Sequence, residues 1–311
     1  MSIPTSQQIG KWYELYRSID VTFTKEIIKS IGLDPRGVFL KCVGEQWPCV
    51  VYSSSFAGAK IIVSSKQLLA DRISKANNMV NLRFSFKISE KPDPVSFFIG
   101  GKVLGFSSYG QGGGDLQYAS LQYTQRPPDD FIDIIGRLLE ANMNSSRRRD
   151  ERILLTPDSM RRLGLVSKDC FVYVQGVPRK CILRDLSFSG AKAIILGLAK
   201  FLVDKECILR VEMDEPRESI DIKGTIVRYE DVEGRKDLTA IALHFDEQAV
   251  PMTFKMHIND CLSQVRQPRT EDAPPQAQGS AHPAAQGAAP SPAQGAALSA
   301  AQSAAQSASQ A

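Results

Sequence analysis

The sequence has few histidines and no closely spaced cysteines. Its six cysteines form no CxxC pair, and its three histidines stand apart from them and from one another. Structural zinc sites and dithiol redox motifs both need such ligands at close spacing. We therefore expect buried free thiols, no metal site and no resident cofactor.

Long apolar runs and a leader-like N-terminus are also missing. The richest apolar stretch, residues 191–203, is interrupted by Lys192 and Lys200, whereas a bilayer span needs roughly 20 apolar residues. The first residues, MSIPTSQQIGKWYELYR, contain no basic stretch that leads into an apolar run. These features predict a reduced, cytoplasmic protein, and a net charge of +4 is too small to indicate nucleic acid by itself.

No catalytic motif stands out either. The glycine-rich segment 109–115 is not followed by the GK[ST] of a phosphate-binding loop, and no Ser or Cys lies in a recognisable nucleophile motif with a histidine. We find no paired acid and base in a context that would support chemistry. The sequence therefore predicts a binding protein and not an enzyme.

Composition divides the chain into four parts. Ala, Gln, Ser, Pro and Gly dominate the end of the chain, and no charged residue follows Asp272. Residues 266–311 cannot offset their ordering entropy by burial, so we expect a disordered tail there. Before it we place a first domain over residues 1–140, an arginine-rich linker over 141–152 and a second domain over 153–265.

The first domain is expected to be a β domain flanked by helices. Residues 1–31 have a helical pattern, in which Thr24 caps the second helix and Gly32 ends it. Segments of β-forming residues separated by Gly, Pro and Ser turns follow over residues 37–124. A closing helix then begins near Pro127 and carries apolar residues on one face.

The second domain has a pattern of short strands followed by one helix. The expected strands cover residues 153–155, 171–174, 180–184, 191–196, 207–213, 220–229 and 238–245. Seven short strands separated by turns predict a closed antiparallel barrel, and residues 251–265 predict a terminal helix with one apolar stripe. The fold class is therefore mainly β with flanking helices.

A basic run lies directly before the first barrel strand. Within six residues the linker contains four arginines, which are Arg147, Arg148, Arg149 and Arg152. A guanidinium is permanently charged, forms forked hydrogen bonds to phosphate or to guanine O6 and N7, and stacks on bases. The alternative is a solvated linker whose charges pair with Asp150 and Glu151, and these acids are expected to weaken phosphate attraction.

A polar turn follows 33 residues after Arg152. The segment Asp185-Leu-Ser-Phe-Ser-Gly190 lies between two expected strands, and its Asp185 carboxylate can accept from guanine N1 and N2. Ser187 can bond a base or a phosphate, and Gly190 allows a tight bend or close ligand approach. Asp, Ser and Gly are also ordinary turn formers, so the segment alone leaves a purely structural role open.

Together the two segments carry a family resemblance. RxxxR (Arg148, Arg152) and DxSxxG (Asp185, Ser187, Gly190) stand in the order and approximate spacing of the PilZ family, which this sequence resembles over roughly residues 147–265. The segments GTIVRYE and IALHFDE also resemble late strands of that family.

The resemblance implies a receptor for cyclic di-GMP, a bacterial second messenger. Arg148 and Arg152 would hold phosphates and guanine Hoogsteen edges, while Asp185 and Ser187 would read the other guanine edge. Further candidate contacts are Arg147, Arg149 and Gly190. Ordering the linker around the nucleotide would then shift the arrangement of the domains.

The first domain resembles, more loosely, the N-terminal domains of flagellar-brake PilZ receptors. This likeness implies a role in bacterial signal transduction, with a protein partner in motility or surface behaviour. Two alternatives remain open. One is a nucleic-acid-binding protein that uses residues 147–152, and the other is a protein-interaction scaffold with a degenerate site.

Overall fold

The structure is a computed structural model that describes residues 4–65, 69–88, 93–110, 115–197, 199–214 and 217–266. The tail expected over 266–311 lies outside the described residues from 267 onward, as do residues 111–114 of the glycine-rich segment. Among the helices of the described ranges, none is both long enough and apolar enough to cross a membrane.

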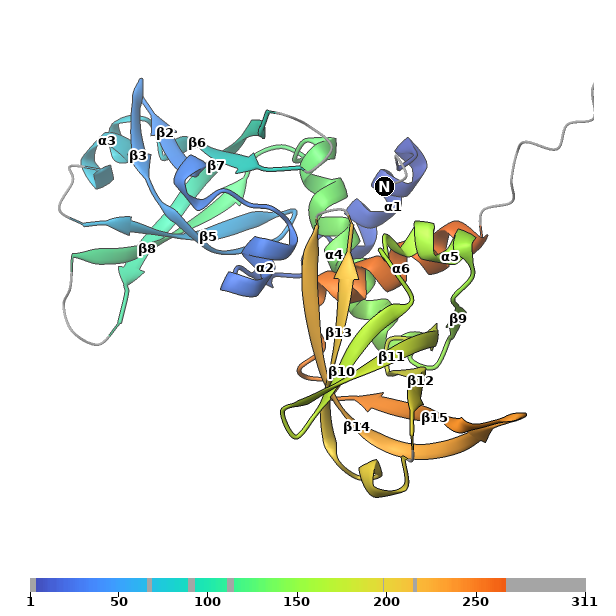
Figure 1. Ribbon diagram of the computed structural model, residues 1–311. Coiled ribbons are helices and arrows are strands. Elements are labelled where there is room, and N and C mark those ends of the chain that lie inside the picture. The colour runs from blue at the N-terminus through green and yellow to red at the C-terminus, as the bar shows by residue number, and fades with distance from the viewer. Residues whose placement is uncertain are drawn as a thin grey trace, which may run out of the picture. The chain divides into compact units, whose positions relative to one another are not determined.

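The first domain is built on one antiparallel sheet of eight strands, in the order β1-β4-β5-β8-β7-β6-β2-β3 (Figure 1). Its strands are β1 (Val21–Thr22), β2 (Phe39–Cys42), β3 (Glu45–Pro48), β4 (Val50–Ser54), β5 (Gly58–Ser64), β6 (Met79–Phe86), β7 (Val95–Ser108) and β8 (Leu116–Tyr123). Buried and partly buried residues alternate along β5, as expected for a strand with one face on the core. The helix-flanked β domain expected from the sequence is confirmed.

The helices of this domain are α1 (Ser6–Tyr16), α2 (Lys25–Ser30), α3 (Leu69–Lys75), α4 (Asp129–Arg147) and the short 3-10 helix η1 (Pro35–Gly37). Three of them, α1, α2 and η1, begin at side-chain caps. Thr24 Oγ1 accepts from the backbone N–H of Ile27 at 3.3 Å and starts α2, as its sequence predicts. Gly32 has φ +66°, a conformation that favours glycine and ends the helix.

Helix α4 closes the core of the first domain. Phe131 at its start is fully buried, with its ring centroid 4.9 Å from that of Phe84. Further along α4, Gly136 faces the ring of Trp12 on α1, where a β-carbon would lie 2.8 Å from the indole. The glycine therefore lets α1 and α4 approach closely, and this contact fixes the helix that leads into the arginine linker.

The second domain is a closed antiparallel barrel of six strands. Its strands are β10 (Asp169–Val174), β11 (Val177–Leu186), β12 (Gly190–Leu196), β13 (Glu206–Met213), β14 (Glu218–Val232) and β15 (Arg235–Phe245). They follow the order β10-β13-β14-β15-β12-β11, and the pairing of β10 with β11 closes the ring. The interior is filled by side chains such as Val172, Leu209 and Ile241, which are fully buried. The barrel expected from the sequence is confirmed.

Three shorter elements complete this domain. They are β9 (Ile153–Leu154), α5 (Pro157–Leu163) and the 3-10 helix η2 (Lys200–Leu202). Seven strands were expected in the ring, but β9 pairs only with the end of β11 and lies outside it. The terminal helix α6 (Met252–Arg266) packs against α5 and α4 (Figure 1).

Three helices differ from the sequence expectation. Helix α3 lies within residues 37–124, where only strands and turns were expected. Helix α4 continues to Arg147, so residues 141–147 of the expected linker are helical. Helix α5 was not expected, although its signals are present: Thr156 forms a capping box with Ser159, Pro157 stands in the first turn, and Gly164 ends the helix at φ +67°. A helix of seven residues is too short to show a clear apolar period, which explains the omission.

Candidate ligand-binding site

The arginine linker reaches the barrel through strand β9. Arg148 follows the last residue of α4, and the backbone N–H of Glu151 donates to the Arg148 carbonyl at 3.0 Å, which turns the chain. Leu154 then pairs with Asp185 and Ile153 with Leu186 on β11. This register brings the end of RxxxR beside the start of DxSxxG.

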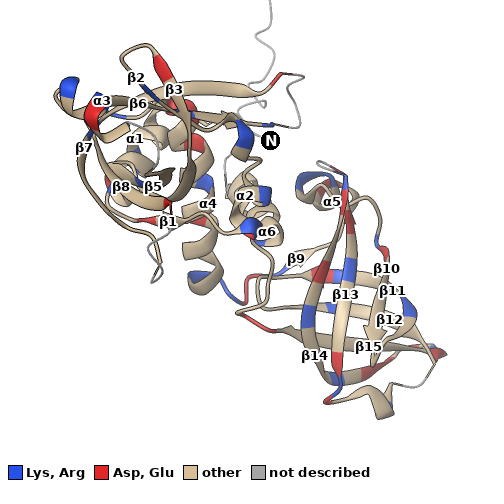
Figure 2. Cartoon of the chain, turned by 90° about the vertical axis from the view of Figure 1, so that its left-hand side faces the viewer, with Lys and Arg blue, Asp and Glu red and all other residues tan. Residues whose placement is uncertain are grey.

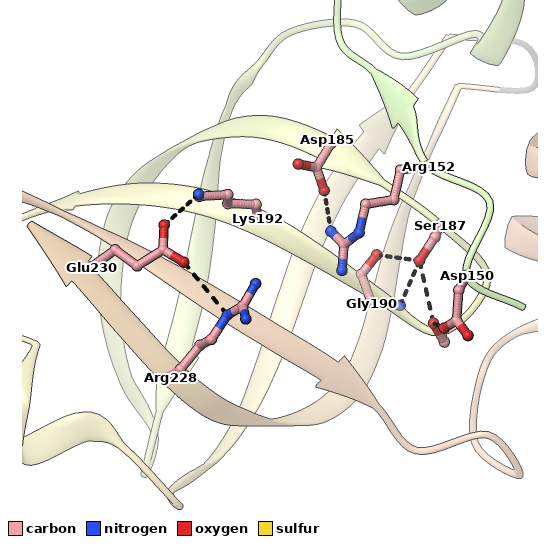
Figure 3. A network of polar contacts seen from close by, with 9 residues as sticks. Asp150, Arg152, Asp185, Ser187, Gly190, Lys192, Arg228 and Glu230 are labelled. Carbon is pink, nitrogen blue, oxygen red and sulfur yellow. Dashed lines mark hydrogen bonds and ion pairs between the residues drawn. The ribbon is translucent and has the colours of Figure 1, made fainter. Parts of the chain in front are cut away.

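Arg152 and Asp185 form an ion pair across this junction (Figure 3). Arg152 Nη1 donates to Asp185 Oδ1. The Asp185 side chain is only 10% exposed, whereas that of Arg152 is 44% exposed. Asp185 lies where the register between β11 and β12 shifts by one residue, a bulge that displaces its side chain from the regular alternation. A carboxylate this buried needs a cationic or hydrogen-bonding partner, and Arg152 provides it.

Ser187 and Gly190 build the turn itself. The fully buried Ser187 Oγ accepts from the Gly190 N–H at 3.0 Å and lies 3.1 Å from the Gly190 carbonyl oxygen. The backbone N–H of Ser187 also donates to that carbonyl at 2.8 Å. Phe188 between them is buried in the barrel core. The hydroxyl of Ser187 therefore shapes the turn, a role that the sequence alone left open.

The remaining arginines of the run lie in different surroundings. The Nη1 atom of Arg148 is buried, and no described residue forms a hydrogen bond with it. Arg149 contacts Glu247 at 3.2 Å and His244 at 3.4 Å, so its guanidinium is turned to the end of β15. Arg147 is exposed in the last turn of α4. The structure thus pairs Arg152 with Asp185 and Arg149 with Glu247, and Nη1 of Arg148 has no hydrogen-bond partner among the described residues.

A second ion cluster lies beside Asp185, and the sequence analysis did not single it out. Lys192 on β12 pairs with Asp185 in the strand register, and its ammonium bonds Glu230 at 2.6 Å. Arg228 lies 3.6 Å from the other oxygen of Glu230 (Figure 3). A hydrogen bond from Lys192 holds the pKa of Glu230 below its ordinary value, with a smaller effect of Arg228. The sequence signal for this cluster was the presence of charged residues at alternate, outward-facing positions of the predicted strands.

The site is an open surface rather than a deep pocket. A cavity of about 10 Å³ lies beside the turn, lined by Ser145, Phe188 and Phe245 among others, which is room for about one water molecule. No group of three or more His, Cys, Asp or Glu within the described ranges is placed to hold a metal ion. A larger ligand would have to bind on the surface between the linker and the turn.

The fold and these contacts define a two-domain β protein in which a basic linker closes on a turn of a small barrel. Residues 7–142 match the PilZN3 domain family, and residues 146–264 match the PilZ domain family. The chain is 46% identical over 271 residues to a cyclic di-GMP binding protein of Treponema denticola, which covers 87% of this chain and 86% of that one. The chain therefore belongs to the family of PilZ-domain proteins with an N-terminal PilZN3 domain, and the PilZ resemblance of its sequence is confirmed.

Solved structures of similar chains include complexes with cyclic di-GMP. The PlzA protein of Borreliella burgdorferi is 24% identical, with a TM-score of 0.38, over 82% of this chain and 98% of that one. YcgR of Escherichia coli is 13% identical, with a TM-score of 0.27, over 85% of this chain and 96% of that one.

Proposed function

We propose that this protein is a cyclic di-GMP receptor, that it is not an enzyme, and that it binds the dinucleotide between the RxxxR linker and the DxSxxG turn. The observation that carries the proposal is the contact of Arg152 with Asp185, because it joins two segments 33 residues apart into one site. The relative from Treponema denticola, which is named for this ligand, supports the choice.

The chemistry of the two segments suits a guanine dinucleotide. Asp185 offers acceptor oxygens for guanine N1 and N2, and Arg152 offers forked donors for a phosphate or for guanine O6 and N7. On binding, each would exchange its present partner for the ligand. Arg148, whose Nη1 atom is buried without a partner, gains a phosphate or base acceptor. Ser187 and Gly190 hold the turn in the shape that presents Asp185.

The linker also connects the proposed ligand site to the first domain. Arg148 follows α4 directly, and α4 contacts the terminal helix through Asn144 Nδ2, which donates to Asn259 Oδ1 at 2.7 Å. A ligand that draws Arg148 toward the barrel acts on the end of α4, so we propose that binding shifts the arrangement of the domains and signals to a protein partner in motility or surface behaviour. The domain limits drawn from the sequence and a cytoplasmic location are part of this proposal.

The distribution of charge disfavours the nucleic-acid alternative. Strands β13 and β14 carry both acidic and basic residues rather than a basic stripe (Figure 2). Arg210 on β13, for example, forms two hydrogen bonds of 2.7 Å to Asp221 on β14. The acidic residues of this surface would repel an extended polyanion, whereas a small dinucleotide contacts only the linker and the turn.

Calorimetry on the full chain tests the proposal. We expect cyclic di-GMP to bind, and Arg148→Ala or Arg152→Ala to weaken binding by at least about 1–3 kcal/mol, the scale of charge-assisted hydrogen bonds. Arg161→Ala on α5 removes the same charge from an exposed position and serves as the matched control. Absence of binding to the unmodified chain, or equal affinity in all four proteins, contradicts the assignment. A steep salt dependence with oligonucleotides would instead support the nucleic-acid alternative.

A further inference from the structure

Ser189, an unassigned position inside DxSxxG, contacts the arginine linker twice. Its hydroxyl donates to Asp150 Oδ1 at 2.9 Å, and its backbone N–H donates to the carbonyl of Arg149 at 3.2 Å. Its own carbonyl accepts from the N–H of Phe245 at 2.8 Å. One residue of the turn thus joins two consecutive linker residues to the end of β15.

Arg149 makes a further contact with the end of β15. Its guanidinium lies 3.2 Å from Glu247 and 3.4 Å from His244, both near the end of β15. Together with the Arg148–Glu151 turn and the Arg152–Asp185 ion pair, these contacts hold the linker between α4 and β9 at several points. Chain segments held at both ends lose less conformational entropy when a ligand orders them.

Asp150 therefore has two opposed effects on an anionic ligand. Its negative charge lies between Arg148 and Arg152 in sequence and repels phosphate, as the sequence alone suggests. Its carboxylate also accepts the hydrogen bond from Ser189 that holds this part of the linker on the turn. The charge acts through solvent because Asp150 is exposed, whereas the hydrogen bond acts directly on the linker backbone.

We propose that Asp150 and Ser189 are positioning residues that hold the arginine linker on the barrel turn, so that Arg148 and Arg152 are placed for the dinucleotide before it arrives. The proposal rests on the function proposed above. It predicts that removing the hydrogen-bond acceptor at position 150, as in Asp150→Ala, weakens binding, although loss of the negative charge alone predicts tighter binding.

The first measurement needs no ligand. Trypsin cleaves after arginine, so the rate of cleavage within residues 147–152, read by mass spectrometry, reports how often the linker leaves the barrel. We expect faster cleavage in Asp150→Ala and Ser189→Ala than in the unmodified chain, and an unchanged rate in Asp150→Asn, whose amide oxygen still accepts from Ser189. Glu206→Ala, which removes an exposed acid from β13, is the control and should not change the rate.

The second measurement is a cyclic di-GMP titration of the same proteins. Asp150→Ala and Ser189→Ala should each bind about fivefold more weakly, the effect of one lost hydrogen bond. The double variant should bind no more weakly than either single variant, because both remove the same contact. Asp150→Asn should bind at least as tightly as the unmodified chain, since it keeps the acceptor and loses the charge.

The two measurements test the positioning role of Asp150 and Ser189 separately from the proposed receptor function. Equal cleavage in all variants, or tighter binding by both Asp150→Ala and Asp150→Asn, overturns the positioning role. If the unmodified chain does not bind cyclic di-GMP, the proposed function fails, while the cleavage rates still decide whether the contact holds the linker. Thermal unfolding of each variant shows whether a change in cleavage reflects loss of the whole fold.

Discussion

Gly190 lies so close to the carbonyl oxygen of Leu243 that a β-carbon on Gly190 would lie 2.2 Å from it. The two strands meet here because Gly190 pairs with His244 in the register of β12 and β15. The glycine of DxSxxG is therefore required for the strands of the barrel to approach, in addition to any role toward a ligand.

Gly190→Ala should destabilise the second domain. The opposing atom is backbone and cannot rotate away, so strand β12 or β15 must shift, at a cost of about 1–3 kcal/mol. Urea unfolding followed by circular dichroism measures the loss. Gly105→Ala on β7 is the control, because nothing lies within 4 Å of a β-carbon there. Equal unfolding midpoints for the two variants would contradict the packing argument.

Arg152→Lys separates charge from hydrogen-bond geometry. Lysine keeps the positive charge and can still pair with Asp185, but it cannot form the forked bonds of a guanidinium. We expect the variant to unfold at the same urea concentration and to bind cyclic di-GMP about tenfold more weakly, by calorimetry. Arg161→Lys on α5 should change neither quantity. Full affinity in Arg152→Lys would show that this side chain contributes only charge.

Much of the barrel could be predicted because its residues alternate between core and solvent along each strand. Val172 and Val174 on β10, for instance, are buried, while Phe171 is exposed. The place of β9 could not be predicted in the same way. A two-residue strand has no period, and only the three-dimensional register shows that it pairs with β11 outside the ring.

The candidate site could also be predicted in part, because its residues belong to two recognisable motifs. The resemblance of RxxxR and DxSxxG to the PilZ family implied that Arg152 and Asp185 share one site, and the structure brings them together. The roles of the residues toward cyclic di-GMP remain predictions. Sequence reasoning assigned Asp150 by its charge alone and left Ser189 without a role, because their contact depends on the path of the linker across the turn. Such long-range side-chain contacts have no local sequence signal.

The charges beside Asp185 should tune affinity in opposite directions. Lys192 lies opposite Asp185 and is bonded to Glu230, so Lys192→Gln removes a cation from the site and Glu230→Gln frees one. We expect weaker binding of the dianionic ligand in the first variant and tighter binding in the second, each by a few-fold at low salt. Both differences should shrink near 1 M salt, where the screening length falls to about 3 Å. Differences that persist at high salt would indicate direct contact with the ligand instead.

Asp260 on α6 makes stability depend on pH. Burial raises its pKa from 3.8 to about 6, with Arg137 opposing the shift and the acids Glu140 and Asp133 adding to it. The folded chain therefore holds a proton on Asp260 in a pH range where the unfolded chain has released it. Stability from this residue is fully present below about pH 4 and is lost as the pH rises through about 6.

Asp260→Asn should remove this dependence, because an amide carries no charge to bury. The difference between the two pKa values corresponds to about 3 kcal/mol, which is an upper limit since Arg137 lies 3.7 Å away and would lose a partner. We expect the variant to be more stable than the unmodified chain at pH 7.5 and equal to it near pH 4, by urea unfolding at each pH. Asp231→Asn on β14 removes an exposed acid and should show no such trend. A variant that is less stable at pH 7.5 would mean that the ion pair with Arg137 outweighs the cost of burying the charge.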